Sequence, residues 1–355
     1  MSAPLVSIGV PTRNRSALLR QTLEMIRGQT YAHLDIVVSD NDSEDDTPEA
    51  VREAAARDPR IRHFRQPRDI GLHGNLNFCL DQSRGELLCL FMDDDQYAPA
   101  IVSEYVEYLD AHPEVGLVCS DWELIDEEGR VIDGRDHPVP AVMDGFDYID
   151  RTIRSGQSFV GCPGAMIRRT ALGATRFDPD GPIGFGDFVV WFQIAETWAI
   201  GHIPRRLWRF RVHTRALSWR PVHSLAPDYE RNVLRYCDRY EARSPHAARR
   251  VARWRRAMRR YLFWALAYEL GLDARAGEGG RSLTSGRRTV FEIAGCRLGD
   301  EERRQVWQML YRYRTGAGQW AVSAILALLF RIQLTAPLAW ASRYPESVRR
   351  IFGWR

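Results

Sequence analysis

The sequence contains no lysine, so all 49 basic residues of this 355-residue chain are arginine. Any cationic side chain that contacts a phosphate must therefore be an arginine, whose planar guanidinium binds oxyanions in a bidentate manner. Cys-x-x-Cys pairs are also absent, and most of the six cysteines lie in apolar runs. We therefore expect reduced core cysteines in a globular, cytosolic protein whose length allows two domains.

Signals for export or for crossing a membrane are absent as well. The chain opens with Met1-Ser2-Ala3-Pro4 and runs directly into an apolar segment, so we expect no signal peptide. The strongly apolar stretch 320–330 has eleven residues, whereas a helix that crosses a bilayer needs about 20. We expect a cytoplasmic protein, with peripheral contact to the inner face of the cytoplasmic membrane as the alternative location.

The charges are divided unevenly along the chain, although the net charge is only +3. Residues 221–355 contain 25 arginines and 12 acidic residues, a net of +13, which leaves −10 for residues 1–220. From residue 221, strand signals also give way to Arg- and Trp-rich helical patterns such as residues 249–270. This change predicts a first domain at 1–220 and a basic, mainly helical domain at 221–355.

The basic domain has several candidate partners. Arginine and tryptophan on amphipathic helices suit an anionic membrane surface, which we rank first. Alternatively, residues 221–355 pack on the first domain and shape an acceptor site, or they form a homo-oligomer. A basic charge is also compatible with nucleic acid, but we do not expect nucleic acid as a partner.

Strand and helix patterns alternate through the first 200 residues. Apolar runs predict strands at 5–10, 34–39, 61–64, 87–92, 115–120 and 165–168. Helical patterns predict helices at 16–27, 47–57, 76–83 and 188–197. Ser16 and Thr47 are candidate N-caps of the first two helices. The alternation predicts an α/β fold with a mostly parallel, Rossmann-like sheet flanked by helices, followed by the mainly helical C-terminal region.

Three consecutive aspartates, Asp93, Asp94 and Asp95, follow the apolar run 87–92. Three carboxylates at the end of a buried strand repel one another unless a cation lies among them, and hard oxygen ligands suit Mg²⁺ or Mn²⁺. In open α/β sheets, phosphorylated ligands bind at the carboxyl ends of strands. The triplet therefore predicts a metal and phosphate site, with an ordinary acidic loop as the alternative.

Two other polar loops should lie beside this triplet, because they also follow predicted strands. The first is Pro11-Thr12-Arg13-Asn14-Arg15, and the second begins at Asp40 and Asn41. Asp40 can accept a hydrogen bond from a base N–H group or a ribose hydroxyl. The Arg13 guanidinium can stack on a base, and Arg15 can reach a phosphate. Together the three loops predict a nucleotide-diphosphate site.

An ordered series of short motifs now points to a known family. The series is Val6 to Arg15, Gln29-Thr30, Asp35 to Ser43 with Asp45-Asp46-Thr47, Gly85-Glu86, Phe91 to Asp95, and Pro99. It resembles the family 2 glycosyltransferases of GT-A fold. The resemblance continues more loosely through Gly164 to Arg169, Gly186-Asp187 with Trp191, and Arg211-Val212-His213. It covers residues 1 to about 215 and does not include the basic domain.

The resemblance implies a role for each matching position. Asp187 is the catalytic base, and Asp93, Asp95 and His213 hold the metal. The nucleotide-sugar donor is bound by Pro11, Thr12, Arg13, Arg15, Asp40, Asp69, Asn75, Asp93 and Asp94.

Some of these positions have simpler alternatives or depart from the family pattern. Asp187 alternatively caps a helix that starts at residue 188, and Asn75 alternatively caps one after the Gly-rich turn 71–75, in which His73 is a lesser donor-binding candidate. The departures from the pattern are Arg13 for an aromatic residue, Asn41 for Asp, Gln96 for a further acid and Gly186 for Glu.

The function that this resemblance implies is inverting transfer of a sugar from a nucleotide-diphosphate sugar to an acceptor hydroxyl, with Mn²⁺ or Mg²⁺ as cofactor. We expect a glycan or lipid-linked glycan acceptor, in the synthesis of bacterial surface polysaccharide or glycoconjugate. A polyprenyl-phosphate acceptor is an alternative, although such enzymes are usually followed by membrane spans. A catalytically inactive sugar-nucleotide-binding scaffold is another, although the retained acids count against it. A sugar-1-phosphate nucleotidyltransferase is disfavoured, because the loop 11–15 has no glycine.

Overall fold

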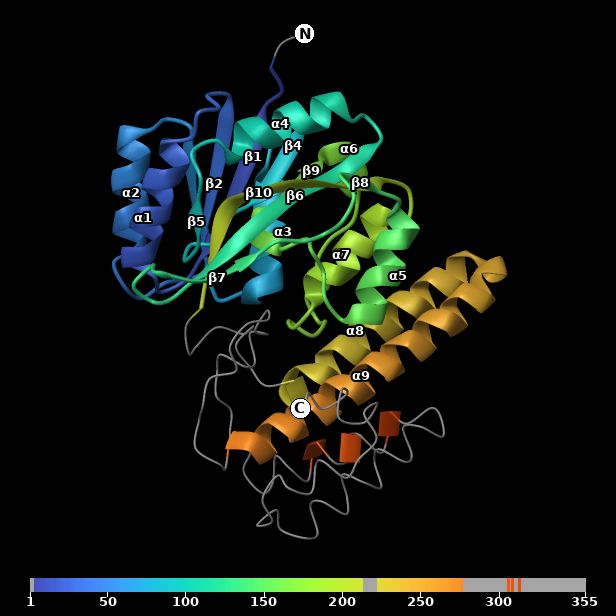
Figure 1. The fold of residues 1–355 in the computed structure, drawn as a ribbon. Coiled ribbons are helices and arrows are strands. Elements are labelled where there is room, and N and C mark those ends of the chain that lie inside the picture. The colour runs from blue at the N-terminus through green and yellow to red at the C-terminus, as the bar shows by residue number, and fades with distance from the viewer. Residues whose placement is uncertain (1–2, 213–221, 277–304, 307, 310–311, 314–355) are drawn as a thin grey trace. The chain divides into compact units, whose positions relative to one another are not determined.

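A computed structural model of the chain describes residues 3–212, 222–276, 305–306, 308–309 and 312–313. Its contacts divide the chain into two units, which are described separately (Figure 1). The first unit comprises residues 1–152 and 157–214, and the second comprises 153–156 and 215–355. The predicted domain boundary after residue 220 lies at the edge of a segment outside the described residues, and it stays a prediction.

The first half of unit 1 alternates strands and helices as predicted. Its elements are β1 (Val6–Thr12), α1 (Ser16–Arg27), β2 (Leu34–Asp40), α2 (Thr47–Arg57), β3 (Ile61–Arg65), α3 (Gly71–Gln82) and β4 (Leu87–Leu90). These strands pair in parallel in the order β3-β2-β1-β4. The register sets Thr12 opposite Asp40, so the polar loops after β1 and β2 begin at the same level of the sheet.

The second half of unit 1 extends this sheet with a different pattern. Its elements are β5 (Gln96–Tyr97), α4 (Ile101–Ala111), β6 (Val115–Ile125), β7 (Val131–Arg135), β8 (Val142–Met143), α5 (Gly145–Ser155), η1 (Cys162–Gly164), β9 (Ala165–Arg168), α6 (Arg169–Leu172), α7 (Gly186–Ala195) and β10 (Ala199–Arg211). The ten-stranded sheet has the path β3-β2-β1-β4-β9-β6-β10-β5, with β7 on β6 and β8 on β10. β9 runs antiparallel between β4 and β6. The predicted α/β fold with helices flanking a central sheet is confirmed.

Helices cover both faces of the sheet (Figure 1). On one face, α1, α2 and α4 bury apolar side chains such as Leu23, Val51 and Tyr105 against the strands. On the other face, α3 lies close to β1, because a Cβ atom at Gly9 would come within 2.7 Å of the Cys79 Cβ. Glycine in β1 therefore permits the close approach of α3.

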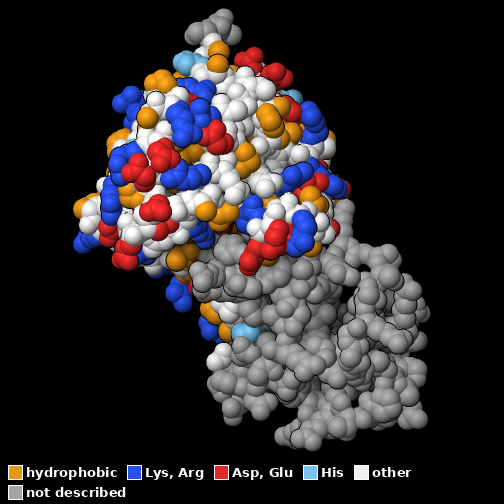
Figure 2. All heavy atoms as spheres, turned by 90° about the vertical axis from the view of Figure 1, so that its left-hand side faces the viewer, with side chains coloured by type: hydrophobic (Ala, Val, Ile, Leu, Met, Phe, Trp, Pro, Cys, Tyr) orange, Lys and Arg blue, Asp and Glu red, His pale blue; other side chains and the backbone are white. Residues whose placement is uncertain are grey.

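The face formed by α1 and α2 carries charges of both signs (Figure 2). Arg52 pairs with Glu49 at 2.5 Å, and Arg27 pairs with Glu24 at 2.7 Å. Such exposed pairs add little stability. Because positive and negative side chains are interspersed on this face, it has no extended patch of positive potential that could attract a polyanion.

Both predicted helix caps are wrong, because a neighbouring loop supplies the capping group. Ser16 and Thr47 are the first residues of α1 and α2, and neither provides a side-chain cap. Instead, Asp45 Oδ2 accepts the Ser16 N–H group at 3.0 Å, and Asp45 Oδ1 accepts the Thr47 N–H group at 3.0 Å. One carboxylate thus satisfies donors at the start of two helices and joins the loops after β1 and β2.

Several elements were longer or earlier than predicted. α3 begins at Gly71 instead of residue 76, so the alternative of a Gly-rich turn at 71–75 is wrong. β6 continues to Ile125, beyond the predicted end at residue 120. The sequence pattern also missed α4, α5 and the long strand β10, since mixed polar and apolar residues hid their periodicity.

Unit 2 contains α8 (Val222–Arg243), η3 (Pro245–Ala247) and α9 (Ala248–Ala276). In the predicted apolar stripe of residues 249–270, the described side chains up to residue 266 form a packing surface: the Trp254 ring lies 5.7 Å from Tyr236 and 5.4 Å from Tyr240, and Met258 and Leu262 are buried. Among the described residues, no helix is both long enough and apolar enough to cross a bilayer. The apolar stretch 320–330 lies outside the described residues.

Candidate active site

The predicted acidic cluster forms where β1, the loop after it and the segment after β4 meet. The Thr12 hydroxyl at the end of β1 donates to Asp93 Oδ2 at 2.7 Å. Arg15 donates from Nη1 to Asp93 Oδ1 at 3.0 Å and to Asp94 Oδ2 at 2.5 Å. Thr22 of α1 holds the turn through a hydrogen bond to the Asp93 carbonyl at 3.0 Å. Arg15 is therefore the counter-charge of this cluster in the structure.

Asp95 lies deeper and is held by the backbone of β10. Its Oδ1 atom accepts the Arg211 N–H group at 2.8 Å, while Arg211 Nε donates to the Asp94 carbonyl at 2.8 Å. Its Oδ2 atom is buried and accepts no hydrogen bond from any residue that the structure describes. A buried carboxylate oxygen without a donor is costly unless a cation binds it. The residues present therefore fit a divalent ion.

The electrostatics of the cluster support the same interpretation. Burial, together with repulsion from Asp94, raises the pKa of Asp93 to about 6, although Arg15 and Thr12 oppose the shift. Burial also raises the pKa of Asp95 well above its ordinary value, again with a contribution from Asp94. The cluster thus holds more negative charge than its protein partners balance, and a bound cation would keep these carboxylates ionised.

The predicted nucleotide-binding Asp40 is fully buried at the end of β2. Its Oδ1 atom accepts the Ser43 N–H group at 3.0 Å, and Arg65 Nε lies 3.8 Å from Oδ2. Beside it, Asn75 of α3 donates to the Ser39 carbonyl at 3.0 Å. Asp40 Oδ2 and Asn75 Oδ1 are both buried without a hydrogen bond from the described residues, so this corner has two acceptors available to a ligand.

Asn41, Asp69 and Arg13 form a second network at the rim. Asn41 Nδ2 donates to Asp69 Oδ1 at 2.7 Å, and Asn41 Oδ1 accepts the Ile70 N–H group at 2.9 Å. An aspartate at residue 41 could not donate to Asp69, which explains the departure from the family pattern. Arg13 also pairs with Asp69, and their side chains are 45% and 41% exposed. These two residues are accessible to a base or ribose.

Pro11 and Thr12 lie within β1 and are buried, whereas the sequence pattern predicted a loop from residue 11. Pro11 pairs with Ser39, one position before the pair of Thr12 and Asp40. Strand β1 therefore places the Thr12 hydroxyl within hydrogen-bond distance of Asp93.

Left-handed backbone conformations occur in three loops of the candidate site. Asn14 follows β1 with φ of 51°, and Asp42 follows β2 with φ of 59°. Asn and Asp tolerate this conformation, but Phe185, with φ of 62°, does not do so readily. Phe185 immediately precedes α7 and therefore sets the direction in which Gly186 and Asp187 enter the site. Such strain is typical of functional segments.

The predicted base, Asp187, lies in the first turn of α7. The helix begins at Gly186, and Phe185 occupies the N-cap position, so the alternative of Asp187 as an N-cap is wrong. Burial raises the pKa of Asp187 to about 6, while backbone N–H groups of Phe188 and Asp187 and the Trp191 side chain oppose the shift. Burial raises the pKa of Cys162, and Asp187 and Asp95 add smaller contributions to the same shift.

Gly186 stands where the family pattern has Glu, and the structure gives the reason. A Cβ atom at Gly186 would lie 2.5 Å from His73 Nε2. The His73 ring is held there because its Nδ1 atom lies 2.7 Å from the Asp178 carbonyl oxygen. His73 of α3 thus fills the space of a side chain at residue 186 and links the donor-side helix α3 to α7.

The motif Arg211-Val212-His213 contains one predicted metal ligand and one supporting residue that sequence reasoning missed. His213 lies outside the described residues, so its predicted metal role stays a prediction. Sequence reasoning missed Arg211 as a support of Asp95, although it belongs to the Arg211-Val212-His213 motif.

Comparison with known proteins identifies the family. The model of glycosyl transferase family 2 matches residues 7–175. The chain belongs to this family. A β-1,3-glucosyltransferase of Campylobacter jejuni that acts on GalNAc(5)-diNAcBac-PP-undecaprenol is 37% identical over 105 residues, which is 29% of this chain and 34% of that protein. The chain spans about a third or less of the length of the first three curated relatives, at 34%, 23% and 34%.

Solved structures show the same fold. The mannosyltransferase PcManGT from Pyrobaculum calidifontis, in complex with GDP-Man and Mn²⁺, superposes with a TM-score of 0.54 at 21% identity, over 93% of this chain and 87% of that one. S. aureus TarS 1-349 with UDP-GlcNAc superposes with a TM-score of 0.56 at 14% identity, over 87% and 80%. The fold of this family 2 member is therefore the GT-A fold.

Proposed function

We propose that this protein is an inverting glycosyltransferase that moves a sugar from a nucleotide-diphosphate sugar to an acceptor hydroxyl. The observation that carries the proposal is Asp95 Oδ2, a buried carboxylate oxygen without a donor among the described residues, inside an acidic cluster at the carboxyl ends of β1 and β4. A site of this kind, in a family 2 domain, suits a divalent ion and a diphosphate.

In this proposal, Asp93 and Asp95 hold Mn²⁺ or Mg²⁺, with His213 as a further ligand. The bound ion would neutralise negative charge on the diphosphate leaving group. Arg15, which pairs with Asp93 and Asp94, is available to bind diphosphate oxygens once a cation compensates these carboxylates. Asp40, Asp69 and Arg13 surround the position for the nucleoside. The complexes of the two similar structures, with GDP-Man and Mn²⁺ and with UDP-GlcNAc, support this class of donor.

Asp187 removes the proton from the acceptor hydroxyl as its oxygen attacks the anomeric carbon. A pKa raised to about 6 makes this carboxylate a stronger base than an exposed aspartate and leaves it ionised at neutral pH. One base and a direct displacement require no covalent intermediate, so the anomeric configuration inverts.

We further propose a lipid-linked glycan acceptor in the synthesis of a bacterial surface glycoconjugate. The undecaprenol-linked acceptor in the name of the Campylobacter jejuni relative supports this choice. A feature of unit 2 supports it independently. Arg249, Arg253, Arg256 and Arg260 of α9 are exposed, and their spacing of four, three and four residues sets them along one side of the helix.

The opposite side of α9 is already buried, since Trp254 and Met258 pack inside unit 2. This part of the chain would therefore meet a membrane through charge and not through insertion of apolar side chains. Each arginine near an anionic surface contributes about 1 kcal/mol at moderate ionic strength. We infer peripheral contact with the inner face of the membrane that weakens as salt is raised.

A thermal-shift screen of UDP, GDP, dTDP and CDP, each with Mn²⁺ or Mg²⁺, tests the donor proposal. One nucleotide should raise the melting temperature of the full chain only with metal, because ligand binding stabilises the folded state. The same nucleotide should not stabilise Asp95→Ala. Stabilisation that is independent of metal and of Asp95 would contradict the proposal. Donor binding without any turnover on lipid-linked acceptors would favour the scaffold alternative.

Co-sedimentation with vesicles tests the membrane proposal. The full chain should bind vesicles containing phosphatidylglycerol at low salt, and replacing Arg249, Arg253, Arg256 and Arg260 by Glu should abolish binding. Replacing the exposed arginines of the α1–α2 face, Arg20 and Arg52, is the matched control and should leave binding unchanged. Equal binding by both variants would contradict a role for α9.

A further inference from the structure

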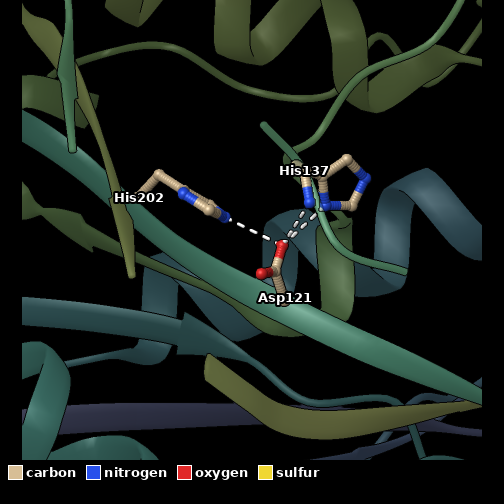
Figure 3. A group of neighbouring side chains, drawn as sticks. All are labelled: Asp121, His137 and His202. Carbon is tan, nitrogen blue, oxygen red and sulfur yellow. Dashed lines mark hydrogen bonds and ion pairs between the residues drawn. The ribbon is translucent and has the colours of Figure 1, made fainter. Parts of the chain in front are cut away.

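A cluster of two histidines and an aspartate lies outside the acidic cluster and the base (Figure 3). Asp121 belongs to β6, His202 belongs to β10, and His137 follows β7. Asp121 Oδ1 lies 2.9 Å from His202 Nε2 and 2.9 Å from His137 Nδ1. It also accepts the backbone N–H group of His137 at 2.8 Å. The two imidazoles therefore converge on Asp121 Oδ1, although the three residues come from three segments of the chain.

The donor set of this cluster differs from that of the acidic cluster. Two imidazole nitrogens and one carboxylate oxygen are ligands that zinc prefers, whereas the carboxylate-rich cluster around Asp95 suits harder cations. The ligand atoms of Asp121, His137 and His202 all lie within 4.8 Å of one another. Zinc bound at about 2.0–2.2 Å to three such atoms separates them by about 3.3 Å in a tetrahedral arrangement. The two observed distances of 2.9 Å require a change of only a few tenths of an ångström.

Packing orients both imidazoles toward Asp121. The Phe159 ring lies 5.8 Å from the His202 ring and 6.4 Å from the His137 ring, and the Trp122 ring lies 6.2 Å from His137. The side chains of His202 and Asp121 are 1% and 5% exposed, whereas that of His137 is 20% exposed. The site is thus largely shielded from water and open to solvent on the His137 side, which gives a cation a route to it.

Arg135 stands two residues before His137, but its charge is offset by Asp133, whose Oδ2 atom lies 3.2 Å from Arg135 Nη2. The neighbouring cation therefore does not present an uncompensated positive charge to the site.

We propose that Asp121, His137 and His202 form a binding site for Zn²⁺ or a similar borderline divalent cation, separate from the donor-binding metal. Three protein ligands leave a fourth position for water. The ion would fasten the segment that follows β7 to the adjacent strands β6 and β10. The proposal does not depend on the proposed transferase activity, because its ligands and its preferred metal are different.

Zinc titration of the metal-depleted full chain tests this proposal, with a chromophoric chelator as competitor. We expect one zinc ion per chain, with binding retained in Asp95→Ala and weakened at least about 100-fold in His137→Gln. His112→Gln is the matched control, because His112 is also partly exposed and lies 3.4 Å from the carboxylate of Glu114. Binding that is equal in the two histidine variants, or lost only in Asp95→Ala, would overturn the proposal.

Cobalt substitution gives a second readout that does not depend on how a variant folds. The wild-type chain with one equivalent of Co²⁺ should show the visible d–d bands of a four-coordinate ion with nitrogen and oxygen ligands. These bands should disappear on addition of one equivalent of Zn²⁺ and persist with excess Mg²⁺. A spectrum of six-coordinate Co²⁺, or displacement by Mg²⁺, would contradict the assignment.

Discussion

Residues 3–95, which we propose bind the donor (the donor half of unit 1), and residues 96–212, which contain the proposed base (the acceptor half), position their functional groups in different ways. In the donor half, Thr12, Asp40 and Asp93 come directly after or at the ends of parallel strands, and the register of β1 and β2 sets their level. In the acceptor half, Asp187 lies on a helix that follows a strained residue, Phe185. The groups proposed to bind the donor are therefore fixed by sheet geometry, and the proposed base is fixed by a turn.

The two halves also treat charge differently. Donor-half carboxylates have arginine partners: Asp93 pairs with Arg15, Asp69 with Arg13, and Asp40 lies near Arg65. Burial raises the pKa of Asp187, as it raises the pKa values of Asp93 and Asp95, but only backbone N–H groups and Trp191 oppose the rise at Asp187. This difference fits the proposed roles, in which one half exchanges ionic partners with a charged ligand and the other accepts a proton.

Replacing Asp95 by Ala should produce the largest loss, because it removes a cation ligand from the donor half. We expect transfer to fall at least about 1000-fold and metal-dependent donor binding to disappear together with it. Initial rates and calorimetric titration with the nucleotide that the thermal-shift screen selects measure the two effects. Asp94→Asn is the matched control, with a smaller loss. Turnover by Asp95→Ala at the wild-type level in the presence of EDTA would show that transfer does not require a metal ion at this site.

The maximal transfer rate should depend on pH through Asp187, the proposed base. Asp187 acts only when it is deprotonated, so the maximal transfer rate should be constant above its pKa of about 6 and fall about tenfold per pH unit below it. Saturating donor and metal keep Asp93, with its similar pKa, ionised during the measurement. The residual rate of Asp187→Asn should lack this step. A step that remains in that variant would assign the proton transfer to another group.

A smaller effect should come from the contact that joins the halves. Gly186→Ala brings a Cβ atom to within 2.5 Å of His73 Nε2, and the hydrogen bond of His73 to the Asp178 carbonyl hinders relief. We expect a loss of about 1–3 kcal/mol in the free energy of unfolding, measured with urea. Gly28→Ala, whose nearest atom is 3.4 Å away, is the control.

The double variant of His73→Ala and Gly186→Ala sharpens this prediction. If the clash causes the loss, the two changes should be non-additive by about 1 kcal/mol or more, with the double variant more stable than their sum. Additive effects would show that His73 does not link α3 to α7.

The difference between the halves also explains what the sequence could predict. Strands β1 and β2 are rich in apolar residues and end at Thr12 and Asp40, and β4 belongs to an apolar run that leads to Asp93, so local patterns located these residues. The same patterns failed for β10, whose burial is interrupted by exposed arginines at residues 205 and 206. Asp187 was found through a family motif and not through periodicity.

Other features depend on contacts between segments that are distant in sequence. Asp45 caps two helices, Arg211 supports Asp95 across more than a hundred residues, and His73 excludes a side chain at Gly186. No local pattern records such partners, because each residue alone has an ordinary surface or loop interpretation. The Asp121 cluster is likewise formed by three segments that only the sheet brings together.

The measurement that tests the division of roles most directly uses Asp187→Asn. Donor affinity is measured by calorimetry with metal present, and the transfer rate is measured in a single turnover with the same donor. We predict donor affinity within about twofold of wild type and a transfer rate at least about 100-fold lower, because only the proton acceptor is lost. A variant that loses donor affinity and transfer together, or that keeps a near wild-type rate, would contradict the separation of a donor half from an acceptor half.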